Sequence, residues 1–139
     1  MTEPSIIERS VEKAHLWLDD VAGELGTEDH QYAYRVLRAY LHALRDRLPV
    51  DEAAQLAAQL PELIRGIYYE GWDPSRTPVK YDGFADFLSR VASEASLDGE
   101  TAASFGVGAA ATVLRRHVSA GEIDDIRANL PEDLRPIIG

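Results

Sequence analysis

The sequence repeats itself at an offset of 70 residues, and this self-similarity limits the folds that are open to it. Residues 44–72 return without a gap as residues 114–138, and the match extends upstream to Leu18 and Leu88. A repeated unit of this kind buries its apolar face against its neighbour, so we predict two tandem units that share one core. The matched residues include Leu44 and Leu114, Arg45 and Arg115, Glu52 and Glu122, Arg65 and Arg135, and the Leu-Pro-Glu motifs at 60–62 and 130–132.

The spacing of apolar residues predicts that the first unit is helical. A capping box formed by Ser5 and Glu8 begins its first helix, and Gly26 supplies the left-handed residue that ends it. We expect Thr27 to cap a second helix that runs to about Leu48. The apolar stripe of the first helix contains Ile7, Val11, Ala14, Leu18, Val21 and Leu25.

Prolines divide the remainder of the first unit. A third helix carries Glu52 near its start and ends before Pro61. A short fourth helix is then expected from Glu62 to about Glu70. Residues 73–82 have no helical period and contain two prolines, so we interpret them as the linker between the units.

The second unit begins near Gly83 and repeats the pattern with smaller residues. Its second helix is expected over residues 100–118, with Phe105 on the apolar face and Gly106 allowing another helix to approach closely. Ser119 and Glu122 predict a second capping box. Inward positions of this second helix are Phe105, Val107, Ala111 and Leu114.

We therefore expect one all-helical domain over residues 1–139. It consists of repeat one at about 5–72, a linker at 73–82 and repeat two at 83–139, and the two units of about 70 residues pack into one multi-helix bundle. A chain of 139 residues is one domain in size.

Composition excludes several kinds of chemistry. The chain has no cysteine, which excludes a disulfide framework, a thiolate metal site and a cysteine nucleophile. Its formal net charge is −10, which argues against nucleic acid as a partner. No apolar run reaches the length of a signal peptide or a membrane span, so we expect a cytoplasmic protein that does not enter a membrane.

Motifs in the first unit resemble a known family. The segments His42-Ala43-Leu44-Arg45-Asp46-Arg47-Leu48, Ala58-Gln59-Leu60-Pro61 and Arg65-Gly66-Ile67-Tyr68-Tyr69-Glu70-Gly71-Trp72 are similar to the prokaryotic domain-of-unknown-function family DUF 2267. The resemblance covers most of the chain, from about Val11 to Leu134. It implies a helical, intracellular protein of bacteria or archaea, and it brings no activity or catalytic residue with it.

A basic stripe follows one side of the second helix. Arg35, Arg38, His42 and Arg45 are spaced so that they share a helix face, and together they form a candidate anion-binding site for a phosphate or carboxylate. The alternative is that these residues form salt bridges with acids on neighbouring helices, because half-buried arginines need partners.

Aromatic residues gather at the end of the first unit. Tyr68, Tyr69, Trp72 and Tyr81 are candidate partner-binding residues, since tyrosine and tryptophan commonly anchor protein interfaces. The alternative is that they cover the groove between the units and fix the linker.

Patterns that would indicate a metal or a catalytic group are incomplete. Glu12 and His15 have the spacing of a di-iron ligand pair, but no second pair accompanies them. Adjacent acids such as Asp51-Glu52 and Asp124-Asp125 are interpreted as helix-start or solvated residues. We therefore predict no catalytic residue, no metal site and no cofactor.

These features favour a non-enzymatic, cytoplasmic protein-interaction or regulatory module that acts on a protein partner or as a homodimer. The alternative is a binder of a small anionic metabolite or cofactor held between the two repeats.

Overall fold

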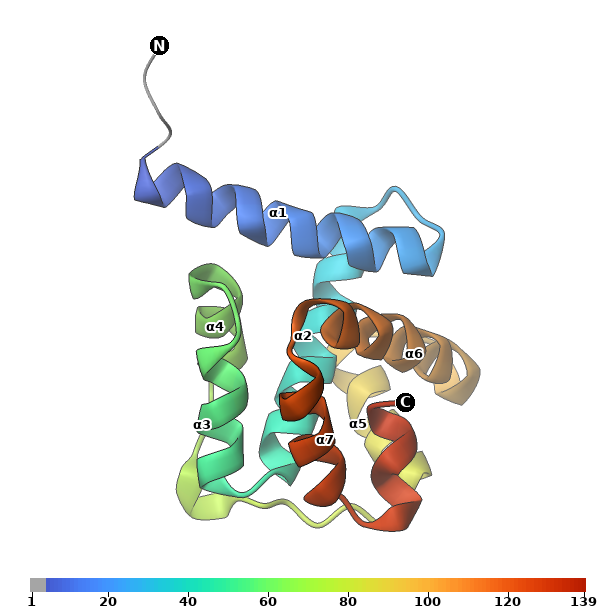
Figure 1. Cartoon of the computed structure of the whole chain (residues 1–139). Helices are drawn as coiled ribbons and strands as arrows, with labels where there is room; N and C mark the ends of the chain where they lie inside the picture. The colour runs from blue at the N-terminus through green and yellow to red at the C-terminus, as the bar shows by residue number, and fades with distance from the viewer. Residues whose placement is uncertain (1–4) are drawn as a thin grey trace.

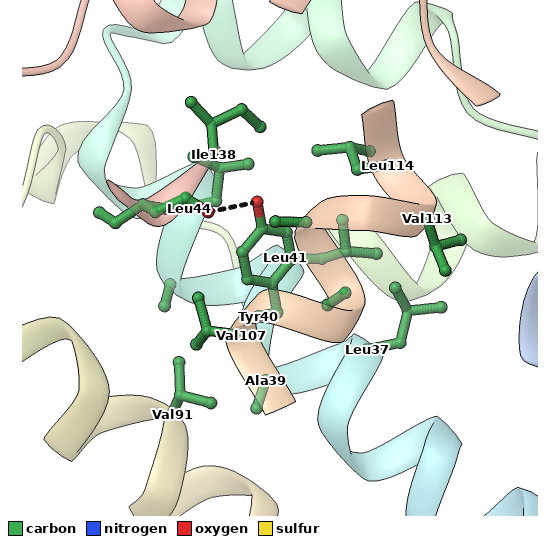
Figure 2. Close-up of a cluster of buried hydrophobic side chains, with 14 of the residues drawn as sticks. Leu37, Ala39, Tyr40, Leu41, Leu44, Val91, Val107, Val113, Leu114 and Ile138 are labelled. Carbon is green, nitrogen blue, oxygen red and sulfur yellow. Dashed lines mark hydrogen bonds between the residues drawn. The ribbon is translucent and has the colours of Figure 1, made fainter. Parts of the chain in front are cut away.

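The central element of the fold is the helix α2 (His30–Arg47), because most of its residues between Ala33 and Asp46 are buried. In the computed structural model, which describes residues 5–139, Tyr40 of this helix is completely buried and its hydroxyl donates a hydrogen bond to the carbonyl oxygen of Ile137 at 2.9 Å. Figure 2 shows Tyr40 surrounded by aliphatic side chains of several helices. The core is therefore built around α2, and the end of the chain closes it.

All regular elements within residues 5–139 are helical, which confirms the predicted all-α class (Figure 1). None of the described helices is long and apolar enough to cross a membrane. The remaining elements are α1 (Ile6–Leu25), α3 (Val50–Ala58), α4 (Glu62–Tyr69), η1 (Pro74–Arg76), α5 (Phe84–Ala95), α6 (Gly99–His117), α7 (Ala120–Ala128) and η2 (Glu132–Ile137), where η denotes a 3₁₀ helix.

The predicted ends of α1 are confirmed. Ser5 and Glu8 form the capping box, and Gly26 adopts a left-handed conformation at φ 67°. The predicted cap of α2 is wrong, because Asp29 and not Thr27 accepts hydrogen bonds from the first amides of the helix. Thr27 instead accepts a bond from the backbone amide of Asp29 at 3.1 Å.

Helix α6 packs closely against α2 at Gly106, as its small residues predict. A Cβ atom at Gly106 would lie only 3.2 Å from Cγ1 of Val36. The prediction for the neighbouring Phe105 is wrong, because its side chain is 55% exposed. Phe105 lies outside the helical face that Ala103, Gly106, Val107 and Ala110 bury.

Helices in the two halves of the chain begin and end at related positions. The helix α3 spans nine residues and so does α7, which begins 70 residues later. The largest difference in length is between α1, which has 20 residues, and α5, which has 12, although these two helices end 70 residues apart. The extra residues of α1 form its N-terminal end, and they determine the shape of one face of the molecule.

Candidate functional site

The predicted basic stripe lies where α2 meets α4 and α5, and its cations are paired with groups of the chain. The guanidinium of Arg38 contacts Glu70 at 2.5 Å and Glu94 at 3.2 Å. His42 contacts Oε2 of Glu94 at 2.8 Å and the carbonyl oxygen of Ile67 at 2.7 Å. Burial opposes ionisation of Glu94, but His42 and Arg38 outweigh burial and hold the pKa of this carboxyl below its ordinary value.

The other two arginines of the stripe bind the ends of helices. Arg45 is only 2% exposed, and its Nη1 donates to the carbonyl oxygens of Tyr68 and Glu70 at the end of α4. Arg35 donates from Nε to the carbonyl oxygen of Ala95, the last residue of α5. These contacts are the ones expected if the basic stripe stabilises the packing of helices. An anion would have to compete with them, and anion binding stays a prediction.

The predicted aromatic residues differ in how much surface they present. Tyr68 is fully buried and Tyr81 is 8% exposed, whereas Tyr69 and Trp72 are half-buried and their ring centroids are 5.2 Å apart. The hydroxyl of Tyr68 donates to the carbonyl oxygen of Ala53 at 2.8 Å. Only Tyr69 and Trp72 therefore retain surface with which a partner could make contact.

Tyr81 connects the linker to α2 through a charged network. Its hydroxyl donates to the carbonyl oxygen of Ala43 and accepts from Arg90, which also pairs with Asp46 at 2.5 Å. Burial opposes the charge of Asp46, yet the hydrogen bonds from Arg45 and Arg90 prevail and lower the pKa of Asp46. The network holds the linker against α2. For Tyr81, this contact agrees with the alternative that the aromatic residues fix the linker.

A pair of buried glutamates lies where α3 packs against α7. Glu52 is 7% exposed and Glu122 is 5% exposed, and oxygen atoms of these two side chains and of Asp125 all lie within 4.8 Å of one another. Burial, together with the neighbouring Glu52, raises the pKa of Glu122 to about 8. Glu52 stands in the first turn of α3, as predicted, but it is buried and not solvated.

The predicted second capping box is only half formed, and this explains how Glu122 reaches Glu52. Ser119 Oγ accepts from the amide of Glu122 at 3.2 Å, but the amide of Ser119 donates to Oε1 of Gln59 at 2.8 Å. Gln59 thus takes the place that the Glu122 carboxylate would fill in a complete box. The sequence contained a signal for both glutamates, since each stands four residues before a buried residue, Leu56 or Ile126.

The N-terminal end of α1 overhangs a groove of about 590 Å³. Figure 1 shows α1 lying across one end of the molecule, next to α4. Trp17, 3% exposed, lies at the inner end of this groove and stacks on His117 with ring centroids 4.8 Å apart. We call this feature the α1 groove, and its lining comprises Ile6, Arg9, Ser10, Lys13, Leu16, Trp17, Gln59, Leu60, Pro61, Glu62, Arg65 and His117.

The apolar stripe predicted for α1 extends past the helices that cover it. Its inner residues Val21 and Leu25 are buried, but Ile7 is 71% exposed and Val11 is 41% exposed. Ile6, on the groove side, is 69% exposed. The predicted apolar stripe is therefore exposed at Ile7 and Val11 and buried at its far end.

A family model for an uncharacterized conserved protein, DUF2267, matches residues 14–137. The chain belongs to the DUF2267 family. No curated protein matches the chain at a significant level. The match to DUF2267 begins at Ala14, which is also the residue of α1 that lies 70 positions before the start of α5. Residues 6–13, which form the overhanging part of α1, therefore lie outside the region matched by DUF2267.

Proposed function

We propose that this DUF2267 protein is a non-enzymatic, cytoplasmic protein-interaction module that binds an amphipathic, acidic helix of a partner in the α1 groove. The observation that carries the proposal is the uncovered apolar end of α1, where Ile6 and Ile7 are each about 70% exposed beside a groove. Grooves of this kind accept a helix through apolar side chains spaced along one of its faces.

The apolar contribution to binding comes from the groove side of α1. Ile6 is 69% exposed and Leu16 is 53% exposed, and both line the groove. Burying one such side chain completely contributes about 1.5–3 kcal/mol. Several of them together offset the cost of ordering two surfaces, which an isolated exposed leucine cannot do.

The charge of the groove determines the kind of partner. Among the residues that line it, the cations Lys13 and Arg65 outnumber the single acid, Glu62. The chain as a whole carries a net charge of −10, so this cationic lining differs from the rest of the molecule. An acidic partner helix would gain from the lining at close range, and this favours it over a second copy of the same acidic chain.

The tandem arrangement of two helical units belongs to the same proposal. It is supported by the equal lengths of α3 and α7 and by the spacing of 70 residues between the ends of α1 and α5. In this view the core is shared by two related units, and the binding element is an extension of the first unit alone.

The proposal is tested by photo-crosslinking in the protein's own host. Benzoylphenylalanine replaces Leu16 in the groove, and the matched control places it at Phe105, whose exposed fraction of 55% is close to the 53% of Leu16. We expect a discrete adduct at position 16 that is not formed at position 105. Mass spectrometry should identify the adduct as an acidic amphipathic helix.

A second pair of variants tests whether the positive charge of the groove contributes to binding. Lys13→Glu should reduce the adduct at least several-fold, whereas Lys80→Glu makes the same charge change in the linker and should leave it unchanged. Adducts of equal yield at positions 16 and 105 would overturn the proposal. An adduct of twice the chain's mass would replace it with a homodimer.

A further inference from the structure

The contact between α3 and α7 brings together three carboxylates with different surroundings. Glu52 comes from α3, while Glu122 and Asp125 lie one turn apart on α7. The two glutamates are more than nine-tenths buried, and Asp125 is exposed. The cluster therefore has an inner part inside the fold and an outer part that opens to solvent.

Two buried oxygen atoms in this cluster have no hydrogen-bond donor among residues 5–139. They are Oε1 of Glu52 and Oε2 of Glu122. Buried carboxylate oxygens almost always accept hydrogen bonds or bind metal ions, because removing them from water is costly. An unpartnered oxygen on each of two facing side chains is therefore a second observation, in addition to the clustering of acids, that indicates a bound group.

The group that fits between these side chains is a cation. Within residues 5–139, the charged groups that act on Glu122 are both acids, Glu52 and Asp125. Ligand sets made only of oxygen are preferred by Ca²⁺, Mn²⁺ and Mg²⁺. Oxygens within 4.8 Å of one another suit such an ion, since a calcium ion at about 2.4 Å from each ligand spans roughly that separation.

We propose that Glu52, Glu122 and Asp125 bind one divalent cation of this class, and that the cation joins α3 to α7. Asp125 supplies the ligand on the solvent side and marks the path by which the ion enters. The ion would link the two halves of the chain, and none of its three ligands lines the proposed partner groove.

The test measures thermal unfolding of the full chain, first in chelator and then with MnCl₂, CaCl₂ or MgCl₂ alone. We expect at least one of these ions to raise the melting temperature in a saturable manner, by about 5–10 °C at a hundred-fold excess over its dissociation constant. Electron paramagnetic resonance of added Mn²⁺ should show one ion bound per chain, because the signal of the free ion decreases on binding.

Isosteric variants separate this site from nonspecific binding to an acidic surface. Glu52→Gln and Glu122→Gln should each abolish the rise in melting temperature, and Asp125→Asn should weaken the apparent affinity about ten-fold or more. Asp51→Asn and Asp124→Asn are matched controls on the same two helices, because both residues are exposed, and they should respond as the wild type does.

Two results would overturn the proposal. The first is the absence of a response to all three ions in the wild-type protein, which would leave a proton shared between the two glutamates as the explanation. The second is an equal response in Glu122→Gln, which would place the bound ions elsewhere on the acidic surface. Circular dichroism of each variant verifies that the helices are retained.

Discussion

The hydroxyl of Tyr40 donates to the carbonyl oxygen of Ile137 at 2.9 Å, and this bond joins the middle of the central helix to the last helical turn of the chain. The two residues are 97 positions apart in sequence. Because Tyr40 is completely buried, water cannot replace the bond.

Replacing Tyr40 with phenylalanine removes this hydroxyl and leaves the ring in place. We expect the free energy of unfolding to fall by about 1–2 kcal/mol, since a buried carbonyl then loses its donor. Urea denaturation followed by circular dichroism measures the change. Tyr34→Phe is the control, because Tyr34 is only half-buried, and a loss of equal size there would contradict the assignment.

Asp46 predicts how stability changes in acid. Its pKa is lower in the folded chain than in the unfolded chain, so below neutrality the unfolded state binds more protons and stability falls with decreasing pH. We expect Asp46→Asn to be less stable than the wild type at pH 7, by about 2–3 kcal/mol, and to lose less stability between pH 5 and pH 3. Denaturation midpoints across this range test both effects, and an unchanged slope would show that Asp46 does not contribute to it.

The buried glutamate pair predicts that one substitution makes the metal-free protein, measured in the presence of chelator, more stable. Glu122→Gln removes one of two facing buried charges and keeps the shape of the side chain, so the melting temperature at pH 8 should rise. Differential scanning calorimetry of this variant beside Asp51→Asn gives the comparison. A lower melting temperature would mean that the Glu122 carboxylate stabilises the chain in its charged form.

Two glycines of α6 predict opposite effects. A Cβ at Gly108 meets no atom within 4 Å, so Gly108→Ala should stabilise the helix by about 0.5–1 kcal/mol. Gly106 packs on Val36, and Gly106→Val should destabilise the fold by about 1–3 kcal/mol. Chemical denaturation of the two variants measures both changes in the free energy of unfolding. Similar changes for both variants would show that α2 and α6 can move apart to accommodate the larger side chain.

Substitutions in the overhang should separate binding from stability. Ile6→Ser combined with Lys13→Ser changes two exposed residues that line the groove, so we expect the free energy of unfolding to change by no more than about 0.5 kcal/mol. The crosslinked adduct at position 16 should nevertheless be lost. If the double variant unfolds more readily by several kcal/mol, these residues belong to the core and not to a binding surface.

Local rules predicted much of the fold, because caps and breaks depend on residues close in sequence. Ser5 with Glu8 and the left-handed Gly26 are examples, and the family was identified from the motif around Arg45. The errors arose where distant segments decide the outcome. Phe105 is apolar but lies off the buried face of α6, and Glu52 is buried where α3 packs against α7, a helix about 70 residues away in sequence.

For the candidate sites too, the sequence predicted features within one helix but not contacts between helices. The spacing of the basic stripe correctly placed Arg38 and His42 on one face, but it could not supply their partners, since Glu94 comes from another helix. The α1 groove was not predicted at all. An apolar stripe has the same appearance in a sequence whether or not another helix covers it.

The eight residues by which α1 exceeds α5 contribute little to the packed core, and this has an evolutionary consequence. Natural selection acts on substitutions in these residues through their effect on binding, and hardly at all through their effect on folding. A lineage could therefore exchange one partner for another by altering about two helical turns, while the bundle that carries them stays constant.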